Sequence, residues 1–148
     1  MQDRIEKTIE LAAPVSRVWR ALTDHNEFGQ WFRVDLEGPF VAGQLCRGSM
    51  TYPGYEGLKW EATVQAMEPE RLFSFTWCPY GEDPDIDYSK EPHTLVEFRL
   101  EPTSDGTRLT ITETGFSALS DAFRDDALRN NTEGWNKQAE NLAAHVDS

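Results

Sequence analysis

The chain has 148 residues, a formal net charge of −12 at pH 7 and a hydrophobic content of 39%. This length suits one domain, so we expect residues 1–148 to form a single domain that buries a sizeable core without disulfides. The negative charge repels phosphate backbones and anionic lipid headgroups, which argues against nucleic-acid and membrane partners.

The cysteines and the short motifs point to a cytoplasmic protein without a metal site. Cys46 and Cys78 lie far apart and form no C-x-x-C pair, which is typical of reduced thiols in a cytosolic chain. The N-terminal residues enter a strand pattern directly, without the apolar stretch of a signal peptide. No zinc spacing, calcium loop or phosphate-binding glycine loop occurs, so we expect no metal and no cofactor.

The first part of the chain predicts one strand and then two short helices. Apolar and polar residues alternate over residues 4–11, which indicates a half-buried strand. Pro14 suits the first turn of a helix whose apolar face recurs over residues 15–22. Asp24 is suited to cap a second short helix, whose inward residues are Phe28, Trp31 and Phe32.

The middle of the chain predicts antiparallel strands. Frequent glycines and prolines from residue 38 to residue 57 indicate short strands and tight turns. Period-two alternation then predicts strands over residues 60–66, 73–77, 96–100 and 108–112, with an Asp105-Gly106 hairpin turn before the last. The segment 79–92 is long for a hairpin connection, so we expect it to form part of a cavity entrance.

A long amphipathic helix is predicted over residues 120–146. Its apolar residues recur at helical spacing: Leu128, Trp135, Ala139, Leu142 and Val146. The pair Asn130-Asn131 and the nearby Gly134 leave open whether this helix is bent or straight. The whole pattern predicts an α+β fold, a curved antiparallel sheet of about six to seven strands that grips the long C-terminal helix.

Several phrases of the sequence occur in an order that resembles the SRPBCC (START-like, helix-grip) superfamily. They are IELAAP at residues 9–14, VWRALTD at 18–24 and WF at 31–32. The phrases PERLFSFTW (69–77), GTRLT (106–110), ETGF (113–116) and EGW (133–135) resemble the subfamily homologous to the activator of the ninety-kilodalton heat-shock chaperone ATPase.

This resemblance spans nearly the whole chain and implies a deep apolar cavity between the sheet and the long helix. Members of the superfamily include lipid carriers, plant hormone receptors, polyketide cyclases and aromatases. The activator itself also has a separate N-terminal domain that makes much of its chaperone contact, and we expect this chain to have no room for one. Contact with a chaperone therefore rests on family resemblance only.

The predicted ligand-binding residues are large aromatic side chains on the inward face and one carboxylate. They are Trp60, Phe73, Phe75, Trp77, Phe98, Glu113 and Trp135. Large rings at the rim of a concave sheet suit stacking against an apolar or planar ligand, whereas for most of these residues the alternative is a filled core. Tyrosines in the loops could rim the cavity, namely Tyr52, Tyr55, Tyr80 and Tyr88.

Two residues are candidates for acid–base chemistry. Alternation from Leu109 and Ile111 places Glu113 on the inward face, where it could act as a general acid or as a ligand anchor. The alternative is that the strand ends before Glu113 and that its carboxylate pairs with an arginine in solvent. His93 is the weaker candidate, because a lone histidine at the start of a strand is more often a surface residue.

These observations favour binding of an apolar small molecule in the cavity between the sheet and the C-terminal helix. One alternative is an enzyme of the polyketide cyclase, aromatase or hydrolase type that uses the same cavity with Glu113 or His93. A further alternative is a co-chaperone-like activator of an ATPase.

Overall fold

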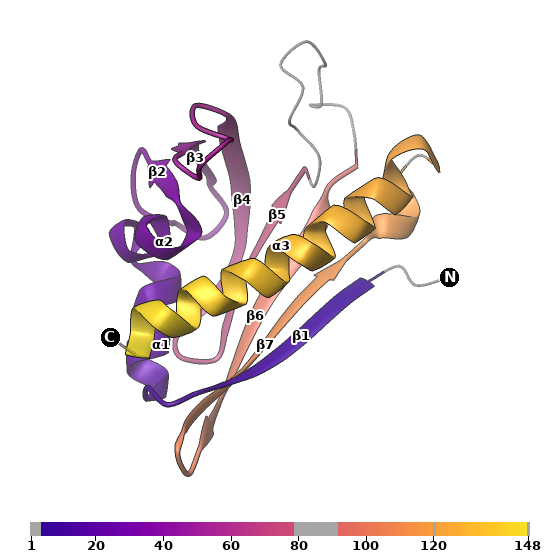
Figure 1. The fold of residues 1–148 in the computed structure, drawn as a ribbon. Coiled ribbons are helices and arrows are strands. Elements are labelled where there is room, and N and C mark those ends of the chain that lie inside the picture. The colour runs from indigo at the N-terminus through magenta and orange to yellow at the C-terminus, as the bar shows by residue number, and fades with distance from the viewer. Residues whose placement is uncertain (1–3, 79–91, 120, 148) are drawn as a thin grey trace.

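The computed structural model describes residues 4–78, 92–119 and 121–147. Within these residues, seven strands form one sheet around a long helix (Figure 1). The elements in chain order are β1 (Arg4–Leu11), α1 (Val15–Thr23), α2 (His25–Phe32), β2 (Val34–Leu36), β3 (Leu45–Met50), β4 (Lys59–Glu68), β5 (Leu72–Trp77), β6 (Thr94–Thr103), β7 (Gly106–Thr114), the short 3₁₀ helix η1 (Phe116–Ala118) and α3 (Asp121–Asp147).

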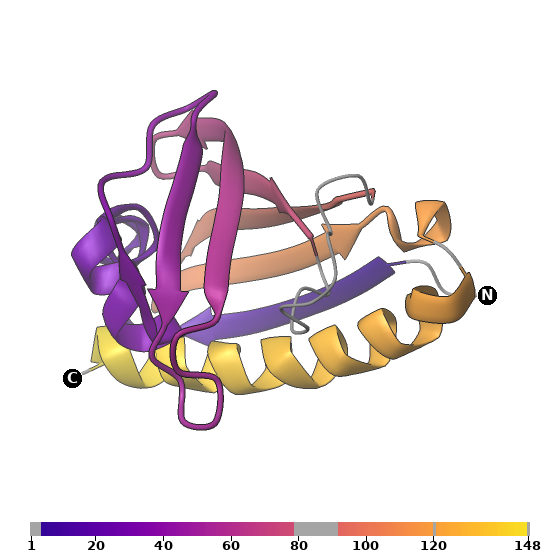
Figure 2. The ribbon, with the colours of Figure 1, turned by 90° about the horizontal axis from the view of Figure 1, so that it is seen from above.

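The strands lie in the order β1-β7-β6-β5-β4-β3-β2, and every neighbouring pair is antiparallel. Helix α3 crosses one face of this sheet, and α1 and α2 lie beside its C-terminal end (Figures 1 and 2). This arrangement confirms the predicted α+β fold, with two short helices after the first strand and a long C-terminal helix gripped by the sheet.

Local sequence signals set the start of α2 and the hairpin between β6 and β7. The Asp24 side chain accepts hydrogen bonds from the backbone N–H groups of Asn26 and Glu27, at 2.9 and 3.2 Å, which is the expected N-cap. Gly106 begins β7 after the Ser104-Asp105 turn, and a Cβ atom there would lie 2.1 Å from the carbonyl oxygen of Leu11. Only glycine therefore fits where this hairpin passes the end of β1.

The sheet bends where β4 pairs with β5. The register between these strands shifts between Val64 and Ala66, and such bulges increase the local twist and bend of a strand. The regular alternation predicted over residues 60–66 therefore holds only to Val64: Trp60 and Val64 are buried, whereas Ala66 is half-buried. This curvature lets the sheet close around α3.

Helix α3 runs without interruption for 27 residues and curves gently along the sheet (Figure 2). No break occurs at Asn130 and Asn131, and Gly134 lies within the helix. The predicted apolar face is directed to the sheet, since Trp135, Ala139, Leu142 and Val146 are buried and Leu128 is half-buried. Of the helices in the part of the chain described, none is long and apolar enough to span a membrane.

Candidate functional site

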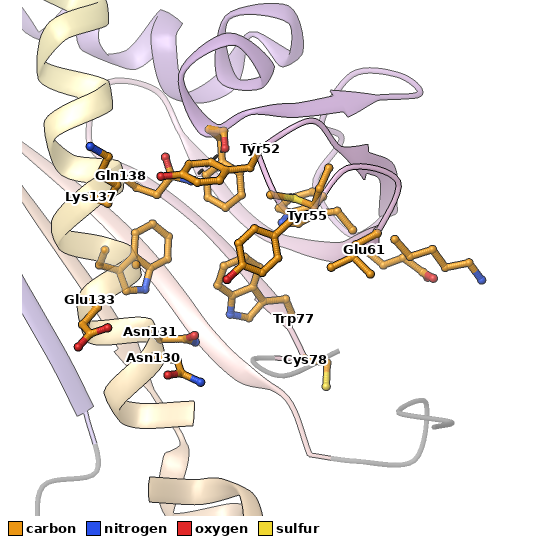
Figure 3. A pocket seen from close by; sticks show the side chains of 17 residues that line it. Tyr52, Tyr55, Glu61, Trp77, Cys78, Asn130, Asn131, Glu133, Lys137 and Gln138 are labelled. Carbon is orange, nitrogen blue, oxygen red and sulfur yellow. Dashed lines mark hydrogen bonds between the residues drawn. The ribbon is translucent and has the colours of Figure 1, made fainter. Parts of the chain in front are cut away.

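A cavity of about 490 Å³ lies between the middle of α3, strands β4 and β5, and the loop that joins β3 to β4. Six aromatic side chains in the described part of the chain line it: Phe32, Tyr52, Tyr55, Trp60, Trp77 and Trp135. Figure 3 shows Tyr52 and Tyr55 on the loop side and residues of α3 on the other side. Because small-molecule pockets commonly measure about 300–1,000 Å³, this cavity has room for a small organic ligand.

Polar residues of both charges surround the mouth of the cavity. Lys59 and Glu61 contribute from β4, and Glu133 and Lys137 contribute from α3. All four side chains are exposed. Among the residues described, the mouth therefore carries two positive and two negative groups.

Four of the rings form a continuous aromatic wall. The Phe32 ring centroid lies 5.8 Å from that of Trp60, 6.1 Å from that of Trp77 and 6.3 Å from that of Trp135. The rings of Trp77 and Trp135 lie 5.7 Å apart and are tilted by 31°. These distances fall in the range of favourable aromatic pairs, so α2, β4, β5 and α3 meet at this wall.

Behind this wall lies the fully buried carboxylate of Glu113 on β7. Its Oε1 accepts a hydrogen bond from the indole Nε1 of Trp135 at 2.8 Å, and its Oε2 accepts one from the indole Nε1 of Trp77 at 2.8 Å. The hydroxyl of Thr94 donates to Oε2 at 2.5 Å. The side-chain amide of Asn131 donates to both oxygens at 3.1 Å. One carboxylate thus joins three elements, β5, β6 and α3, to its own strand.

The Glu113 network has donors but no counter-cation among the residues described. Every partner in the described part of the chain is a neutral N–H or O–H group, and Glu113 takes part in none of the ion pairs between described residues. Burial of an ionised carboxylate is costly unless hydrogen bonds replace its water. Here the donors from four side chains supply that replacement.

The same hydrogen bonds orient the two indoles of the wall. Because the N–H edges of Trp77 and Trp135 are directed to Glu113, the surface that these rings present to the cavity is carbon. The electron density of an aromatic ring is concentrated on its faces, whereas its edge is positive. Glu113 therefore determines which part of each indole a ligand can meet.

Trp60 differs from its two neighbours in the wall. Its side chain is 6% exposed, and its indole Nε1 is buried without a hydrogen-bond partner among the residues described. The rings around it belong to Phe28, Phe32, Phe75 and Trp77. The Trp60 indole thus lacks, among the residues described, the hydrogen bond that buried tryptophans usually make.

The structure divides the predicted ligand-binding residues into two groups. Trp60, Trp77 and Trp135 line the cavity. Phe73, Phe75 and Phe98 are fully buried in the core and do not line it, with the rings of Phe73 and Phe98 stacked at 6.0 Å. Alternation along a strand predicts which face a residue occupies, but not how deep under the helix it lies.

The two candidates for acid–base chemistry lie outside the cavity wall. Strand β7 continues to Thr114, so Glu113 is inward and fully buried, which contradicts the alternative of a solvent-exposed ion pair with an arginine. The Glu113 side chain is behind the wall and does not line the cavity. His93 is exposed just before β6 and does not line the cavity either.

Sequence reasoning missed three polar residues of the site. Asn131 and Thr94 hold Glu113, and the side-chain amide of the buried Gln138 donates to the backbone carbonyl of Phe32 at 2.9 Å. Asn131 and Gln138 lie four residues before and three residues after Trp135, so they share its helix face. That spacing was a usable signal, whereas nothing in the sequence marks Thr94.

Two further sequence predictions fall partly or wholly outside the described part of the chain. The predicted entrance, residues 79–92, follows Cys78, which lines the cavity, but only Pro92 of this segment is described. Tyr80 and Tyr88 also lie outside it. Among the residues described, no group of three or more side chains is arranged to hold a metal ion.

Solved structures with this fold come from several bacteria. Protein MLL2253 from Mesorhizobium loti is 24% identical, with a TM-score of 0.77 over 97% of this chain and 96% of that chain. Protein CV1439 from Chromobacterium violaceum is 20% identical, with a TM-score of 0.77 over 100% and 99%. Identities at this level show a shared fold.

A third similar structure is DynU16, described as a protein in the dynemicin biosynthetic locus. It is 22% identical, with a TM-score of 0.77 over 100% of this chain and 48% of that chain, so this chain spans about half the length of DynU16.

A search of functionally curated proteins gives no match. The model of one protein family, however, matches residues 12–147. The chain belongs to the family described as Activator of Hsp90 ATPase homolog 1-like protein, within the SRPBCC helix-grip fold.

Proposed function

We propose that this protein binds an apolar small molecule in the cavity between its sheet and helix α3. The observation that carries the proposal is the aromatic wall of Phe32, Trp60, Trp77 and Trp135 along a cavity of about 490 Å³. An aromatic lining with a few polar groups at the mouth is typical of ligand pockets.

The sequence of helix α3 also supports a retained cavity. Gly134 lines the cavity, and a Cβ atom built there would meet no atom within 4 Å. Alanine would therefore fit, and it is about 1 kcal/mol more favourable than glycine inside a helix. A glycine that lowers helix stability and is not needed for backbone packing is consistent with space kept for a ligand.

The geometry gives less support to the two alternative functions. The two residues predicted for acid–base chemistry, Glu113 and His93, do not line the cavity, so an enzyme of the cyclase or hydrolase type would have to use another lining group, such as Glu133 or Tyr52. A chaperone-binding module would need an exposed apolar patch. Among the residues described, the large exposed apolar side chains are Val41, Leu45 and Tyr55.

We keep the cytoplasm as the proposed compartment, because the cysteine pattern is typical of reducing conditions.

Native mass spectrometry tests the binding proposal. The purified protein would be measured alone and after exposure to fatty acids, flavonoids and polyketide-like aromatic compounds. We expect a one-to-one adduct with at least one planar apolar compound, and loss of that adduct in the Trp135→Ala variant. A protein that takes up no compound of the panel would contradict the proposal.

Trp19→Phe is the matched control. Trp19 on α1 is half-buried and does not line the cavity, so this variant also removes one tryptophan but leaves the wall intact. We expect it to retain the adduct. If Trp19→Phe and Trp135→Ala lose the adduct equally, binding in this cavity is contradicted.

A further inference from the structure

We infer that the preferred ligand is an apolar cation, such as an aromatic molecule with a quaternary or tertiary amine, held against the rings of Trp77 and Trp135. The inference rests on the proposed function, since it names the class of ligand for the same cavity. It starts from a buried acidic group whose described partners carry no positive charge. Glu113 is a fully buried carboxylate, and its partners in the described chain are all neutral donors.

The two indoles connect the Glu113 carboxylate to the cavity. Each donates its N–H to a different oxygen of Glu113, at 2.8 Å, and each also lines the cavity. A hydrogen bond to an anion polarises its donor, and such chains strengthen one another in a medium of low dielectric constant. The polarisation leaves more negative charge on the ring surfaces that the cavity meets, and these surfaces attract cations.

The charged residues described at the rim of the cavity do not cancel this effect. At the rim, Lys59 and Lys137 are balanced by Glu61 and Glu133. The Glu61 carboxylate already lies 3.7 Å from Arg47, and the Lys137 ammonium lies 3.8 Å from Glu140. All of these groups are exposed and therefore screened by water and salt, whereas Glu113 is buried.

The overall charge of the protein acts in the same direction. A net charge of −12 concentrates cations near the surface and speeds their arrival at a cleft. A small anion would meet repulsion from the whole surface and again from Glu113. A neutral molecule would gain the apolar contact alone. The expected order of affinity is therefore cation, then neutral molecule, then anion.

Three probes of nearly equal shape test this order: phenyltrimethylammonium, tert-butylbenzene and benzenesulfonate. Each has a phenyl ring with a tetrahedral group that is positive, neutral or negative. Binding to the unmodified protein would be followed by isothermal titration calorimetry, or by tryptophan fluorescence for the poorly soluble neutral probe. We expect phenyltrimethylammonium to bind about tenfold more tightly than tert-butylbenzene, and benzenesulfonate to bind most weakly.

The Glu113→Gln variant removes the charge and keeps a side chain of the same size. We expect it to lose most of the tenfold preference while it retains affinity for tert-butylbenzene. Glu97→Gln is the matched control, since Glu97 on β6 bonds to Arg99 at 2.9 Å and does not line the cavity. It changes the net charge by the same amount, and we expect the full preference to persist.

The outcomes distinguish this inference from the proposed function. Equal affinity for the cationic and neutral probes, or tighter binding of the sulfonate, would overturn the inference and leave a cavity that binds apolar molecules. Binding of none of the three probes would overturn both. The comparison of probes uses only the unmodified protein, so it decides the question even if Glu113→Gln does not fold.

Discussion

Trp135 in the middle of α3 donates its indole N–H to the buried carboxylate of Glu113 near the end of β7, at 2.8 Å. The two residues are 22 positions apart in the chain. Their bond connects the helix to the sheet under the wall of the cavity. The packing of the fold and the shape of the candidate site therefore depend on the same group.

Replacement of Glu113 by glutamine should lower the free energy of unfolding. The amide keeps one acceptor oxygen, but its NH₂ group would face the N–H donors of Trp77 or Trp135. Hydrogen bonds to a charged group and the penalty for unsatisfied donors predict a loss of about 2–3 kcal/mol. Urea unfolding measures it. A change within about 0.5 kcal/mol, as is usual for a surface substitution, would contradict the role assigned to this carboxylate.

A comparison of two tryptophans tests how much the hydrogen bond to the carboxylate of Glu113 stabilises the protein. Trp135→Phe keeps a ring but removes the N–H that donates to the carboxylate, whereas Trp31→Phe removes an N–H that donates to the backbone carbonyl of Ala21 at 2.8 Å. Both indoles are 3% exposed. Bonds to charged groups contribute about 1.5–3 kcal/mol and neutral ones about 1 kcal/mol. The Trp135 variant should therefore be less stable than the Trp31 variant by denaturant unfolding, and the opposite order would contradict a stronger hydrogen bond to the carboxylate of Glu113.

Two substitutions of Gly134 test the stability of helix α3 and the volume of the cavity separately. Because a Cβ atom there meets nothing within 4 Å, Gly134→Ala should raise the free energy of unfolding by up to about 1 kcal/mol. Gly134→Leu should also fold, but its side chain would enter the cavity and weaken ligand uptake. Thermal unfolding and native mass spectrometry report the two effects. Loss of stability in Gly134→Ala would contradict the open space above this residue.

An ionic cluster joins α1, α2 and α3 near the C-terminal end of α3. One oxygen of Glu27 lies 2.6 Å from Arg17 and 2.9 Å from His145, and the other lies 2.7 Å from Arg20. Burial raises the pKa of the Glu27 carboxyl, but the hydrogen bonds from His145, Arg17 and Arg20 together outweigh it. The pKa of Glu27 is therefore lowered from its ordinary value of 4.5.

This lowered pKa predicts how stability depends on pH. A carboxyl whose pKa is lower in the folded state stabilises the protein fully when the pH is above its pKa in the unfolded state, about 4.5. This stabilisation is lost as the pH falls through the pKa of the folded state. Glu27→Gln should therefore lower stability at pH 7, and its difference from the unmodified protein should shrink below about pH 4.5. Urea unfolding over pH 3–7 measures this. A difference that does not change with pH would contradict the assignment.

The sequence predicted the fold in most of its parts because the signals were local or repeated. Alternation marked β1, β4, β6 and β7, Asp24 marked the cap of α2, and the apolar spacing around Trp135 marked α3. The bulge after Val64 carried no signal, because a register shift depends on pairing with β5. Asn130, Asn131 and Gly134 left open whether the helix bends, and α3 is continuous since packing against the sheet outweighs a modest loss of propensity.

The candidate site was predicted less completely, because it depends on depth and on contacts between distant strands. Period two placed Phe73, Trp77 and Glu113 on the same inward face, but it could not show that Phe73 belongs to the core and Trp77 to the cavity. Nor could it show that Glu113 and Trp77, 36 positions apart, share a hydrogen bond. That contact arises only when β5, β6 and β7 pair under α3.

The central claim is that a ligand occupies the cavity beside the aromatic wall. The most direct measurement is the ¹H–¹⁵N spectrum of the five indole N–H groups during titration with phenyltrimethylammonium, with signals assigned from Trp→Phe variants. We predict saturable shifts for Trp60, Trp77 and Trp135, and none for Trp19 and Trp31, which do not line the cavity. Saturable shifts confined to Trp19 and Trp31, or no saturable shift with this probe or with the neutral tert-butylbenzene, would contradict the account.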